Sequence, residues 1–292
     1  MKKILITGAT GFLGSHLAKE FVNKGHQVII LKRPKSDIRR IESILPVISA
    51  YDTDGLDLSK PFKDHGRIDA VIHTATCYGR NNESISDIFE VNTAFPLRLL
   101  ETAAFFNTDT FFNTDTILYK YLNGYSLSKK HFMEWGKQFS SMGKIRFVNV
   151  RLEHMYGTGD HDSKFTTHVI KSCLANIPEL KLTPGEQMRD FIYIDDVVSA
   201  YDILLHKTGQ QLEMFQEYDV GTGKAVSIRE FVEVAHQMAC SVTRLNFGAL
   251  PYREHEVMRS EADIAPLKAL GWICRIGLAE GVEKIIQEES RK

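Results

Sequence analysis

The sequence predicts an α/β protein built on a doubly wound parallel sheet, and three patterns carry this prediction. Residues 3–14 form a short apolar run, a turn with glycines at every third position, and the start of an amphipathic helix. Residues 26–31 form a second apolar run after Gly25, which completes a strand, helix and strand unit. Residues 68–75 form a further strand that is apolar almost throughout, as in parallel strands buried on both faces. Such units wind into a Rossmann-type sheet.

The glycine turn has the chemistry of a phosphate-binding loop. Gly8 permits a tight turn, Gly11 lets the backbone approach a diphosphate, and Gly14 lets the helix pack closely against the strand. The free N–H groups at the start of the helix would face the phosphates. An ordinary glycine-rich turn has the same spacing, but the flanking strand and helix argue against it. The expected cofactor contacts in this loop are Gly8, Thr10, Gly11, Phe12 and Leu13.

The end of the second strand indicates which dinucleotide is bound. An NAD site expects Asp or Glu about 20 residues beyond the loop, where a carboxylate accepts hydrogen bonds from the adenosine ribose. Lys32 and Arg33 stand at that point, followed by Ser36. A carboxylate would repel the 2′-phosphate of NADP, whereas a guanidinium can hold it through paired hydrogen bonds. The sequence therefore favours NADP(H) as the cofactor, with a solvated basic loop as the alternative.

Two further strand ends contribute expected cofactor contacts. Residues 55–58 have the pattern of the exit of the third strand, and small residues end the strand at 68–75. His73, within that strand, is expected to be a packed histidine rather than a catalyst. The contacts expected from these two ends are Asp57, Leu58, Thr74, Ala75 and Thr76.

A long helix and a repeated hexapeptide follow. Residues 85–104 have a helical pattern in which Pro96 either kinks the helix or marks a fresh first turn. The hexapeptide FFNTDT then occurs at 105–110 and again at 111–116. Because the first copy directly follows the helical pattern, we assign the fifth strand to the second copy.

Composition and charge exclude several classes of protein. The 292 residues carry a formal net charge of −1, so no overall field favours nucleic acid or an anionic membrane surface. The four cysteines form no CxxC pair, which argues against zinc and against a disulfide framework. No stretch approaches the ~18 apolar residues that span a bilayer. We expect a cytoplasmic protein with no nucleic-acid partner, no membrane partner and no metal.

Tyr125 and Lys129 form the candidate catalytic pair. Residues 125–139 have a helical pattern, so these two side chains share one face, a turn apart. Chance alone would place about one such pair in a chain with this many tyrosines and lysines. The pair therefore matters only in the company of other motifs.

Several further motifs occur along the chain, and their order resembles that of the extended branch of the short-chain dehydrogenase/reductase superfamily, which modifies nucleotide sugars. The resemblance covers nearly the whole chain. It includes the glycine loop, Asn92, YSLSK at 125–129, RDFIYIDDV at 189–197, YDVGTG at 218–223 and LGW at 270–272. The phrases NTDT, YLNGYSLSKK and NVRLEHMYG are similar to bacterial nucleotide-linked 4-keto-6-deoxyhexose reductases.

The resemblance implies the organisation of the chain. It implies an NADP-binding domain at 1–156 plus about 190–223, and a smaller discontinuous C-terminal lobe for the nucleotide sugar at about 157–189 plus 224–292. It also implies a homodimer formed through the helix that ends near Ala104 and the helix of Tyr125. Asn92 joins the expected cofactor contacts, as do Tyr125 and Lys129.

The resemblance also implies the catalytic roles. Tyr125 is the general acid that protonates the sugar oxygen, and Lys129 holds the nicotinamide ribose. The ammonium group of Lys129 is expected to lower the pKa of the phenol by favouring the phenolate. Thr114 is our choice for the hydroxyl that orients the carbonyl. Thr116 is the second choice for this role, and Thr108, from the first copy of the repeat, is the third.

Three activities of the family compete, and the sequence favours reduction. Related 4,6-dehydratases carry Asp-Glu after the hydroxyl residue, whereas this chain has Asp115 followed by Thr116, so the base is missing. Related 4-epimerases keep NAD tightly bound, whereas the basic pair after the second strand favours exchangeable NADPH. We expect reduction of the C4 ketone of a nucleotide-activated (CDP- or dTDP-) 4-keto-6-deoxyhexose for surface polysaccharide. An epimerase and a non-catalytic NADP-responsive binding protein are the alternatives.

The expected substrate contacts come from both halves of the chain. Arg189 and Arg253 are candidates for the substrate diphosphate, with a fold-holding salt bridge and a surface charge as their alternatives. His161, Asp162 and His168 lie where a loop runs into a helix, which does not favour a metal site. The full set of expected substrate contacts is Thr114, Asp115, Thr116, His154, Arg189 and Arg253.

Overall fold

The computed structural model of the protein describes residues 1–207, 213–254 and 256–291. The chain forms two compact units, and each is described here by itself. The first unit comprises residues 1–151 and 201–218, and the second comprises residues 152–200 and 219–292. The domain boundaries expected from the sequence were 156, about 190 and about 223.

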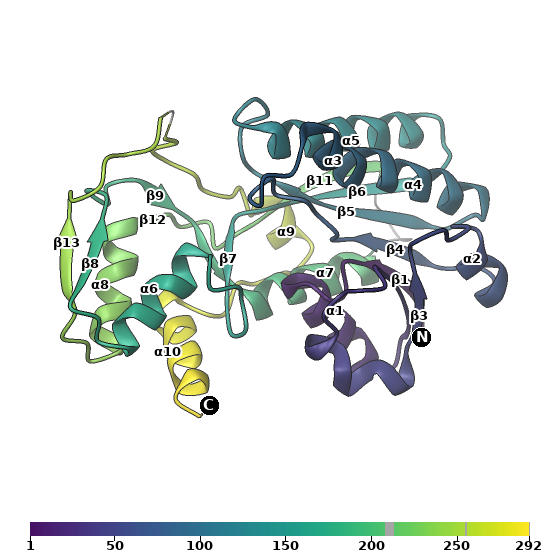
Figure 1. The fold of residues 1–292 in the computed structure, drawn as a ribbon. Coiled ribbons are helices and arrows are strands. Elements are labelled where there is room, and N and C mark those ends of the chain that lie inside the picture. The colour runs from purple at the N-terminus through teal and green to yellow at the C-terminus, as the bar shows by residue number, and fades with distance from the viewer. Residues whose placement is uncertain (208–212, 255, 292) are drawn as a thin grey trace. The chain divides into compact units, whose positions relative to one another are not determined.

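The first unit is built on a seven-stranded sheet in the order β11-β6-β5-β4-β1-β2-β3 (Figure 1). The pairs β1–β2, β2–β3, β1–β4 and β4–β5 are parallel. The chain winds outward from β1 to β3 and then returns to β4 on the other side of β1, so the direction of winding reverses between β1 and β4. The predicted doubly wound sheet is confirmed. Its strands are β1 Lys3–Thr7, β2 Gln27–Lys32, β3 Ser49–Asp52, β4 Ala70–His73, β5 Thr110–Thr116, β6 Arg146–Leu152 and β11 Phe215–Val220.

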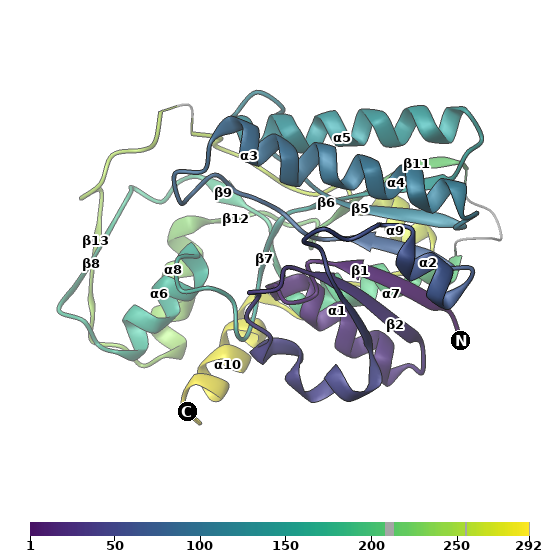
Figure 2. The same ribbon diagram turned by 45° about the vertical axis from the view of Figure 1, so that its right-hand side comes forward.

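Helices cover both faces of this sheet. In Figures 1 and 2, α3, α4 and α5 lie over one face, and α1 and α7 lie over the other. The helical segments are α1 Phe12–Asn23, η1 Arg39–Val47, α2 Lys60–His65, α3 Ile85–Phe89, η2 Glu90–Ala94, α4 Phe95–Phe105, α5 Gly124–Ser141 and α7 Ile194–Lys207. Strand ends and helix starts therefore meet at the carboxyl edge of the sheet, where α/β proteins bind their ligands.

In this unit one sequence prediction is refined, one is confirmed and one is wrong. The helical pattern at 85–104 is interrupted by a π-helical turn, Glu90–Ala94, and Pro96 lies in the first turn of the helix that follows. The second copy of FFNTDT forms β5, as predicted. The third strand ends at Asp52, so residues 55–58 are not its exit. They form the connection to α2, because Gly55 adopts a positive φ that turns the chain.

Aromatic rings fill the space between α5 and the sheet. Phe111 and Phe147 stack with their ring centroids 5.7 Å apart, and Phe132 packs edge-on against both. All three rings are fully buried. Gly136 faces them from α5, because a Cβ atom there would lie 2.2 Å from the Phe147 ring. Helix α5 can therefore approach the sheet this closely only because position 136 is glycine.

In its described residues, the second unit contains three short strand pairs, four whole helices and the first half of α7. The pairs are β7–β10 and β8–β13, which are parallel, and β9–β12, which is antiparallel. In its core, Tyr156 packs edge to face against Phe191 and Phe231, whose own ring centroids lie 4.5 Å apart at an interplanar angle of 34°. The strands are β7 His154–Tyr156, β8 Glu179–Leu182, β9 Met188–Arg189, β10 Phe191–Tyr193, β12 Val226–Ser227 and β13 Arg244–Phe247. The helices are α6 Phe165–Leu174, α8 Ile228–Met238, α9 Ala265–Ala269 and α10 Leu278–Glu289.

None of the helices in the described part of the chain is both long enough and apolar enough to cross a bilayer.

The tight fit at Gly136 gives a test of the core. Alanine is the better helix former by about 1 kcal/mol, so propensity alone predicts that Gly136→Ala stabilises the protein. We expect the opposite, a loss of about 1–3 kcal/mol, because the added methyl group collides with the stacked ring of Phe147. Urea unfolding measures the change. Gly277→Ala is the control, since no atom lies within 4 Å of its added Cβ, and a stabilised Gly136→Ala variant would contradict this packing.

Candidate active site

The predicted catalytic pair lies at the start of α5. The Asn123 side chain caps this helix by accepting a hydrogen bond of 2.8 Å from the backbone N–H of Ser126. Tyr125 is partly buried in the first turn, and Lys129 follows one turn later with 1% of its surface exposed. A cap this close to Tyr125 fixes the direction of the helix where the candidate chemistry occurs.

The electrostatics of this pair differ from the sequence expectation. Burial raises the pKa of the Tyr125 phenol above its usual value, and the charge of Asp115 adds to this effect. Among the neighbouring charges, the Arg80 guanidinium acts in the opposite direction and lowers the pKa of this phenol. Burial lowers the pKa of Lys129 itself to about 8, against a smaller raising effect from Asp115. In this structure, therefore, desolvation outweighs the expected effect of Lys129 on the phenol.

The three candidate hydroxyls lie in different surroundings. The Thr114 hydroxyl is 2.6 Å from the hydroxyl of Tyr201 in α7, so it is already engaged within the first unit. The Thr116 hydroxyl accepts a hydrogen bond of 3.2 Å from the Leu118 N–H and acts to lower the pKa of the Tyr125 phenol. Thr108 is 4% exposed, and its hydroxyl has no hydrogen-bond partner among the described residues. Thr116, our second choice, therefore influences the pKa of Tyr125, whereas Thr114, our first choice, is paired with Tyr201.

Asp115 lies in a buried polar network. Its carboxylate accepts hydrogen bonds from Lys130 at 2.9 Å and from the Asn149 amide at 3.0 Å. Asn149 also donates to Glu217 at 2.7 Å, and Glu217 forms an ion pair with Arg151. The Asp115 side chain is fully buried, so its oxygens already serve protein donors. A substrate contact was expected for this carboxylate, and the structure gives it internal partners instead.

Asn92 connects the loop after β4 to α5. It lies in the π-helical turn η2, is fully buried, and both accepts from the Cys77 N–H and donates to the Cys77 carbonyl, at 2.8 Å each. Its amide also donates to the Ser128 hydroxyl at 3.0 Å. The side chain expected to contact the cofactor is therefore occupied with protein groups. It holds the loop that begins at Thr76 beside the helix of Tyr125.

That loop brings two residues to Tyr125 that the sequence reasoning missed. The ring centroids of Tyr78 and Tyr125 are 5.1 Å apart, and the Arg80 guanidinium lies 5.0 Å from the centroid of Tyr78. The available signal was an aromatic and a basic residue within a few positions of the end of a buried strand. Loops at the carboxyl ends of parallel strands commonly supply ligand contacts.

The glycine loop has the close backbone contacts that its motif predicts. Gly8 has a φ of +71°, and a Cβ atom at this position would lie 2.6 Å from the backbone nitrogen of Ala75. A Cβ at Gly14 would lie 2.2 Å from the Gly8 carbonyl oxygen. The loops after β1 and β4 thus pack against each other, and Thr74 contacts both glycines. The remaining expected contacts, Thr10, Gly11, Phe12 and Leu13, lead into α1 or form its first turn.

The two basic residues at the end of β2 have different surroundings. Lys32 pairs with Asp52, its partner across the β2–β3 register. Arg33 is exposed, and its carbonyl accepts the Ser36 N–H at 3.0 Å, which closes a turn. Of the two basic side chains expected at an adenosine 2′-phosphate, Arg33 is therefore the one that extends into solvent.

The predicted adenine contacts lie beyond β3. Asp57 is exposed, accepts hydrogen bonds from Ser59 and pairs with Lys63. Leu58 packs against the core of the first unit. Asp57 therefore shapes the start of α2 as well as standing where an adenine contact was expected.

The second unit contains the other predicted substrate residues. Arg189 forms an ion pair with Glu256 and donates to the Met188 carbonyl at 2.7 Å. Burial lowers the pKa of Arg189, and the nearby charge of Arg253 lowers it further. His154 lies 3.1 Å from the Glu153 carboxylate. The two arginines are thus close enough to interact, and Glu256 balances part of their charge.

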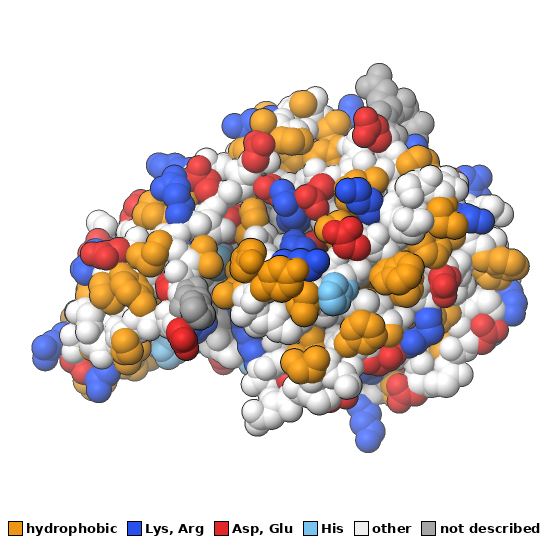
Figure 3. Space-filling view, turned by 90° about the horizontal axis from the view of Figure 1, so that it is seen from above, with side chains coloured by type: hydrophobic (Ala, Val, Ile, Leu, Met, Phe, Trp, Pro, Cys, Tyr) orange, Lys and Arg blue, Asp and Glu red, His pale blue; other side chains and the backbone are white. Residues whose placement is uncertain are grey.

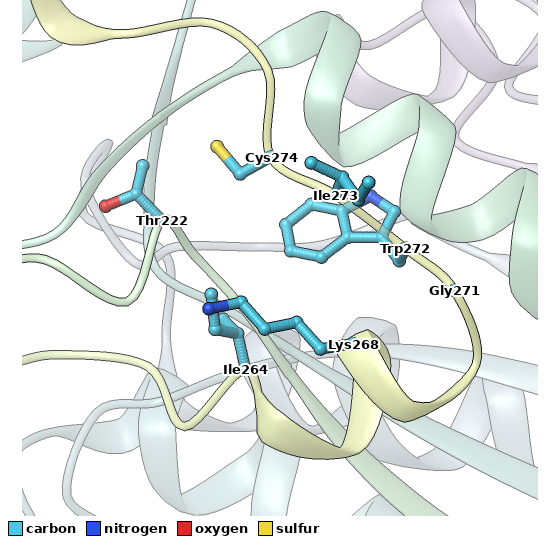
Figure 4. Close-up of a pocket in the computed structure, with 7 residues that line it drawn as sticks. All are labelled: Thr222, Ile264, Lys268, Gly271, Trp272, Ile273 and Cys274. Atoms are coloured by element: carbon cyan, nitrogen blue, oxygen red, sulfur yellow. The ribbon is translucent and has the colours of Figure 1, made fainter.

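A pocket of about 390 Å³ opens within the second unit (Figure 4). Trp272 forms one wall, with Lys268 running beside it and the Cys274 thiol nearby. The pocket is lined by Thr222, Ile264, Lys268, Gly271, Trp272, Ile273 and Cys274. None of the predicted site residues is among those that line it.

Comparison with known proteins identifies relatives over the whole chain. CDP-abequose synthase of Salmonella muenchen is 37% identical over 292 residues, covering 98% of this chain and 97% of the relative. CDP-abequose synthase of Salmonella typhimurium is 33% identical, covering 97% of both. A UDP-glucose 4-epimerase structure from Stenotrophomonas maltophila, with bound NAD and formylated UDP-arabinopyranose, has a TM-score of 0.88 at 19% identity. That match covers 100% of this chain and 99% of the other.

The predicted family resemblance is confirmed by these comparisons. The NAD dependent epimerase/dehydratase family matches residues 4–221, which include the glycine loop, Asn92, Tyr125 and Lys129. The chain belongs to the NAD dependent epimerase/dehydratase family.

Proposed function

We propose that this protein is an NADPH-dependent reductase of nucleotide sugars. Its substrate is a CDP- or dTDP-linked 4-keto-6-deoxyhexose, and its product, with a hydroxyl at C4, serves surface polysaccharide synthesis in the cytoplasm. The observation that carries the proposal is the capped start of α5, which holds Tyr125 and, one turn later, the buried Lys129, while Thr116 of β5 acts on the pKa of the Tyr125 phenol. The full-length similarity to two CDP-abequose synthases supports the substrate class.

The residues of the glycine loop fit the diphosphate of a dinucleotide. In the described residues of α1, no side chain caps the helix and no acidic residue stands in its first turn, so its amides remain available to an anion. Gly11 adds no Cβ on the side from which a diphosphate would approach. We assign the diphosphate to residues 8–13 and the 2′-phosphate to Arg33 and Ser36. Thr74, Ala75 and Thr76 then border the nicotinamide half of the cofactor.

Each catalytic side chain has a defined task in this proposal. NADPH supplies a hydride to C4 of the sugar. Tyr125 donates its phenolic proton to the ketone oxygen, and its raised pKa keeps that proton in place at neutral pH. Thr116 is assigned the hydroxyl that donates a hydrogen bond to the ketone oxygen and so orients the ketone beside Tyr125. Lys129, with a pKa of about 8, is mostly protonated at pH 7 and binds the nicotinamide ribose.

The surroundings of Asp115 argue against dehydration. Elimination of water requires a free acid and a free base beside the sugar. Asp115 is fully buried and accepts hydrogen bonds from Lys130 and Asn149, and threonine follows it.

A 4-epimerase with tightly bound NAD is the second candidate, because the pairing of Lys32 with Asp52 leaves less positive charge for a 2′-phosphate.

The substrate diphosphate is assigned to Arg189 and Arg253, with His154 near the sugar. Two neighbouring guanidinium groups suit a dianion through charge-assisted hydrogen bonds.

We also propose a homodimer formed through α4 and α5. Figure 3, which looks onto the face that these helices cover, shows hydrophobic side chains interspersed among charged ones. Phe105, Trp135 and Met142 are exposed on these helices or directly after them, which suits a surface that a second copy covers.

Tyr125→Phe tests the proposed acid. The wild-type protein should oxidise NADPH with one or more members of a panel of CDP-, dTDP-, GDP- and UDP-4-keto-6-deoxy sugars, followed by absorbance. Removal of the phenolic proton should lower kcat by about 10²- to 10⁴-fold while cofactor binding persists. Tyr119→Phe, at an exposed tyrosine, is the control and should retain activity. Co-purified NAD together with turnover of a UDP-hexose without added cofactor would instead support the epimerase.

Arg33→Ser tests the cofactor assignment. Loss of a bidentate contact to the 2′-phosphate should raise the KM for NADPH about tenfold or more and leave the KM for NADH within about twofold. Steady-state kinetics with both cofactors measure the difference. Lys35→Ser, at an exposed neighbouring cation, is the control. Equal changes for the two cofactors would contradict a role for Arg33 at the 2′-phosphate.

Lys129→Met tests the burial of the lysine. Below pH 8 this lysine is protonated in both the folded and unfolded states, so the folded state bears the full desolvation penalty, about 3 kcal/mol at most. The variant should therefore be more stable than wild type at pH 7 and nearly inactive. Between pH 8 and 10.5 the unfolded state binds more protons, so wild type gains stability and the difference should shrink.

Thermal melting from pH 7 to pH 9.5 measures this difference between Lys129→Met and wild type. Lys130→Met is the matched control. It should lose stability, because it leaves the buried Asp115 charge without its ion-pair partner. A Lys129→Met variant that melts below wild type at pH 7 would show that the Lys129 ammonium is a net stabilising group.

A further inference from the structure

Glu153 is a buried carboxylate beside one of the residues assigned to the substrate. It lies between β6 and β7, and its side chain is fully buried, whereas the side chain of its neighbour His154 is 38% exposed. Burying a carboxylate costs free energy unless hydrogen bonds replace those it made to water. The partners of Glu153 therefore indicate what this carboxylate does.

Each oxygen of the Glu153 carboxylate has its own partner. The Ser260 hydroxyl donates to Oε1 at 2.5 Å, and Nδ1 of His154 lies 3.1 Å from Oε2. An ionised carboxylate only accepts hydrogen bonds, so Nδ1 must carry a proton in this contact. Ser260 fixes the rotation of the carboxylate, and the carboxylate in turn selects the tautomer of the His154 imidazole.

The opposite nitrogen of the imidazole is left for a ligand. Among the described residues, none gives Nε2 of His154 a hydrogen-bond partner. The ring packs edge-on against Phe191, with the centroids 5.9 Å apart, and its side chain is partly exposed. A neutral imidazole with its proton on Nδ1 has a lone pair on Nε2. Nε2 can therefore accept a hydrogen bond from a ligand, but it cannot donate one.

Backbone hydrogen bonds place this imidazole beside the segment that carries Arg189. The His154 N–H donates to the Asp190 carbonyl at 3.1 Å, and the Ser260 N–H donates to the Met188 carbonyl at 3.1 Å. These two contacts lie on either side of Arg189 in the chain. The residues that fix the imidazole and the arginine assigned to the diphosphate are thus held together within the second unit.

The charges of this cluster suit two different parts of a nucleotide sugar. The guanidinium groups of Arg189 and Arg253 attract the diphosphate. A lone pair on Nε2 of His154 repels phosphate oxygens, so this nitrogen suits an uncharged hydrogen-bond donor instead. In a nucleotide sugar, the donors that flank the diphosphate are the hydroxyl groups of the hexose and of the ribose.

We propose that Glu153 is a positioning residue, which holds His154 in the tautomer whose Nε2 accepts a hydrogen bond from a hydroxyl group of the nucleotide sugar. This proposal rests on the substrate class proposed above. It makes His154 a specificity-determining residue, because a substrate without that hydroxyl group would leave the nitrogen unpaired.

The tautomer is observable in the wild-type protein without substrate. Nitrogen-15 chemical shifts of histidine side chains distinguish a protonated ring nitrogen from an unprotonated one. At pH 8.5, at which imidazole in water is neutral, His154 should have a protonated Nδ1 and an unprotonated Nε2. The variant His154→Phe identifies the signals by their loss. A proton on Nε2, or protons on both nitrogens, would overturn the proposal.

Glu153→Met tests the positioning role. Loss of the carboxylate should move the proton to Nε2, the form that predominates in water, so that Nε2 no longer accepts. The KM for the best ketone substrate of the panel should rise about tenfold, while kcat and the KM for NADPH stay within about twofold. Glu280→Gln, at an exposed carboxylate of α10, is the control and should change neither the KM nor the histidine spectrum.

Inhibition by the free nucleoside diphosphate locates the hydroxyl group. If the group belongs to the hexose, Glu153→Met should leave the inhibition constant within about twofold of wild type. If it belongs to the ribose, the inhibition constant should rise together with the KM.

A double-mutant cycle separates orientation of the ring from folding. In the His154→Phe background, Glu153→Met should change the KM by less than about twofold, because its effect acts through the missing imidazole. Thermal melting of all variants shows any loss of stability, and such a loss by itself would not produce this coupling.

Additive effects on the KM would overturn the role of Glu153 and leave the reductase proposal standing. An unchanged KM in Glu153→Met would also overturn it, whereas Tyr125→Phe would still report on the reductase. Absence of NADPH oxidation with every ketone in the panel would overturn the proposed function, and the wild-type spectrum would still decide the tautomer.

Discussion

The close contact of two backbones at the carboxyl ends of β1 and β4 is the constraint on which this structure depends. Gly14 lies against the Gly8 carbonyl, and Gly8 lies against the Thr74–Ala75 backbone, at distances that no side chain would allow. This contact joins the start of α1 to both central strands where the winding of the sheet reverses. Thr7 and His73 connect the same two strands by a hydrogen bond of 2.7 Å between fully buried side chains. The glycine loop and the loop that contacts Tyr125 are therefore held together by the same close backbone contact.

Desolvation has the largest effect on the protonation of the candidate catalytic side chains. Around Tyr125 and Lys129, burial has a larger effect on both pKa values than any neighbouring charge does. It keeps the phenol protonated and brings the pKa of the lysine near neutrality. Asp115, Lys130 and Asn149 form a network of charges and dipoles in the same unit, so buried polar groups are paired within an apolar setting.

The sequence predicted the elements of the fold better than the contacts of the site. Glycine spacing, buried strands and the FFNTDT repeat each depend on local pattern, and the first strand, the fifth strand and the helix of Tyr125 were found where that pattern indicated. The choice between Thr114 and Thr116 depends on Tyr201, which lies about 85 residues further along the chain. Likewise, the pairing of Lys32 with Asp52 and the packing of Tyr78 on Tyr125 follow from tertiary proximity. No periodicity in one sequence encodes such proximity.

The π-helical turn between α3 and α4 also constrains how this region can change in length. A π turn contains one more residue than the α turn that would replace it. Loss of a single residue from Glu90–Ala94 would convert the turn to regular helix, which keeps the phase of α3 relative to α4 but removes the widened turn that carries Asn92. Asn92 would then no longer reach Cys77 and Ser128 together. A one-residue deletion on this helix would thus release the loop that carries Tyr78 and Arg80, although it would remove no residue from that loop.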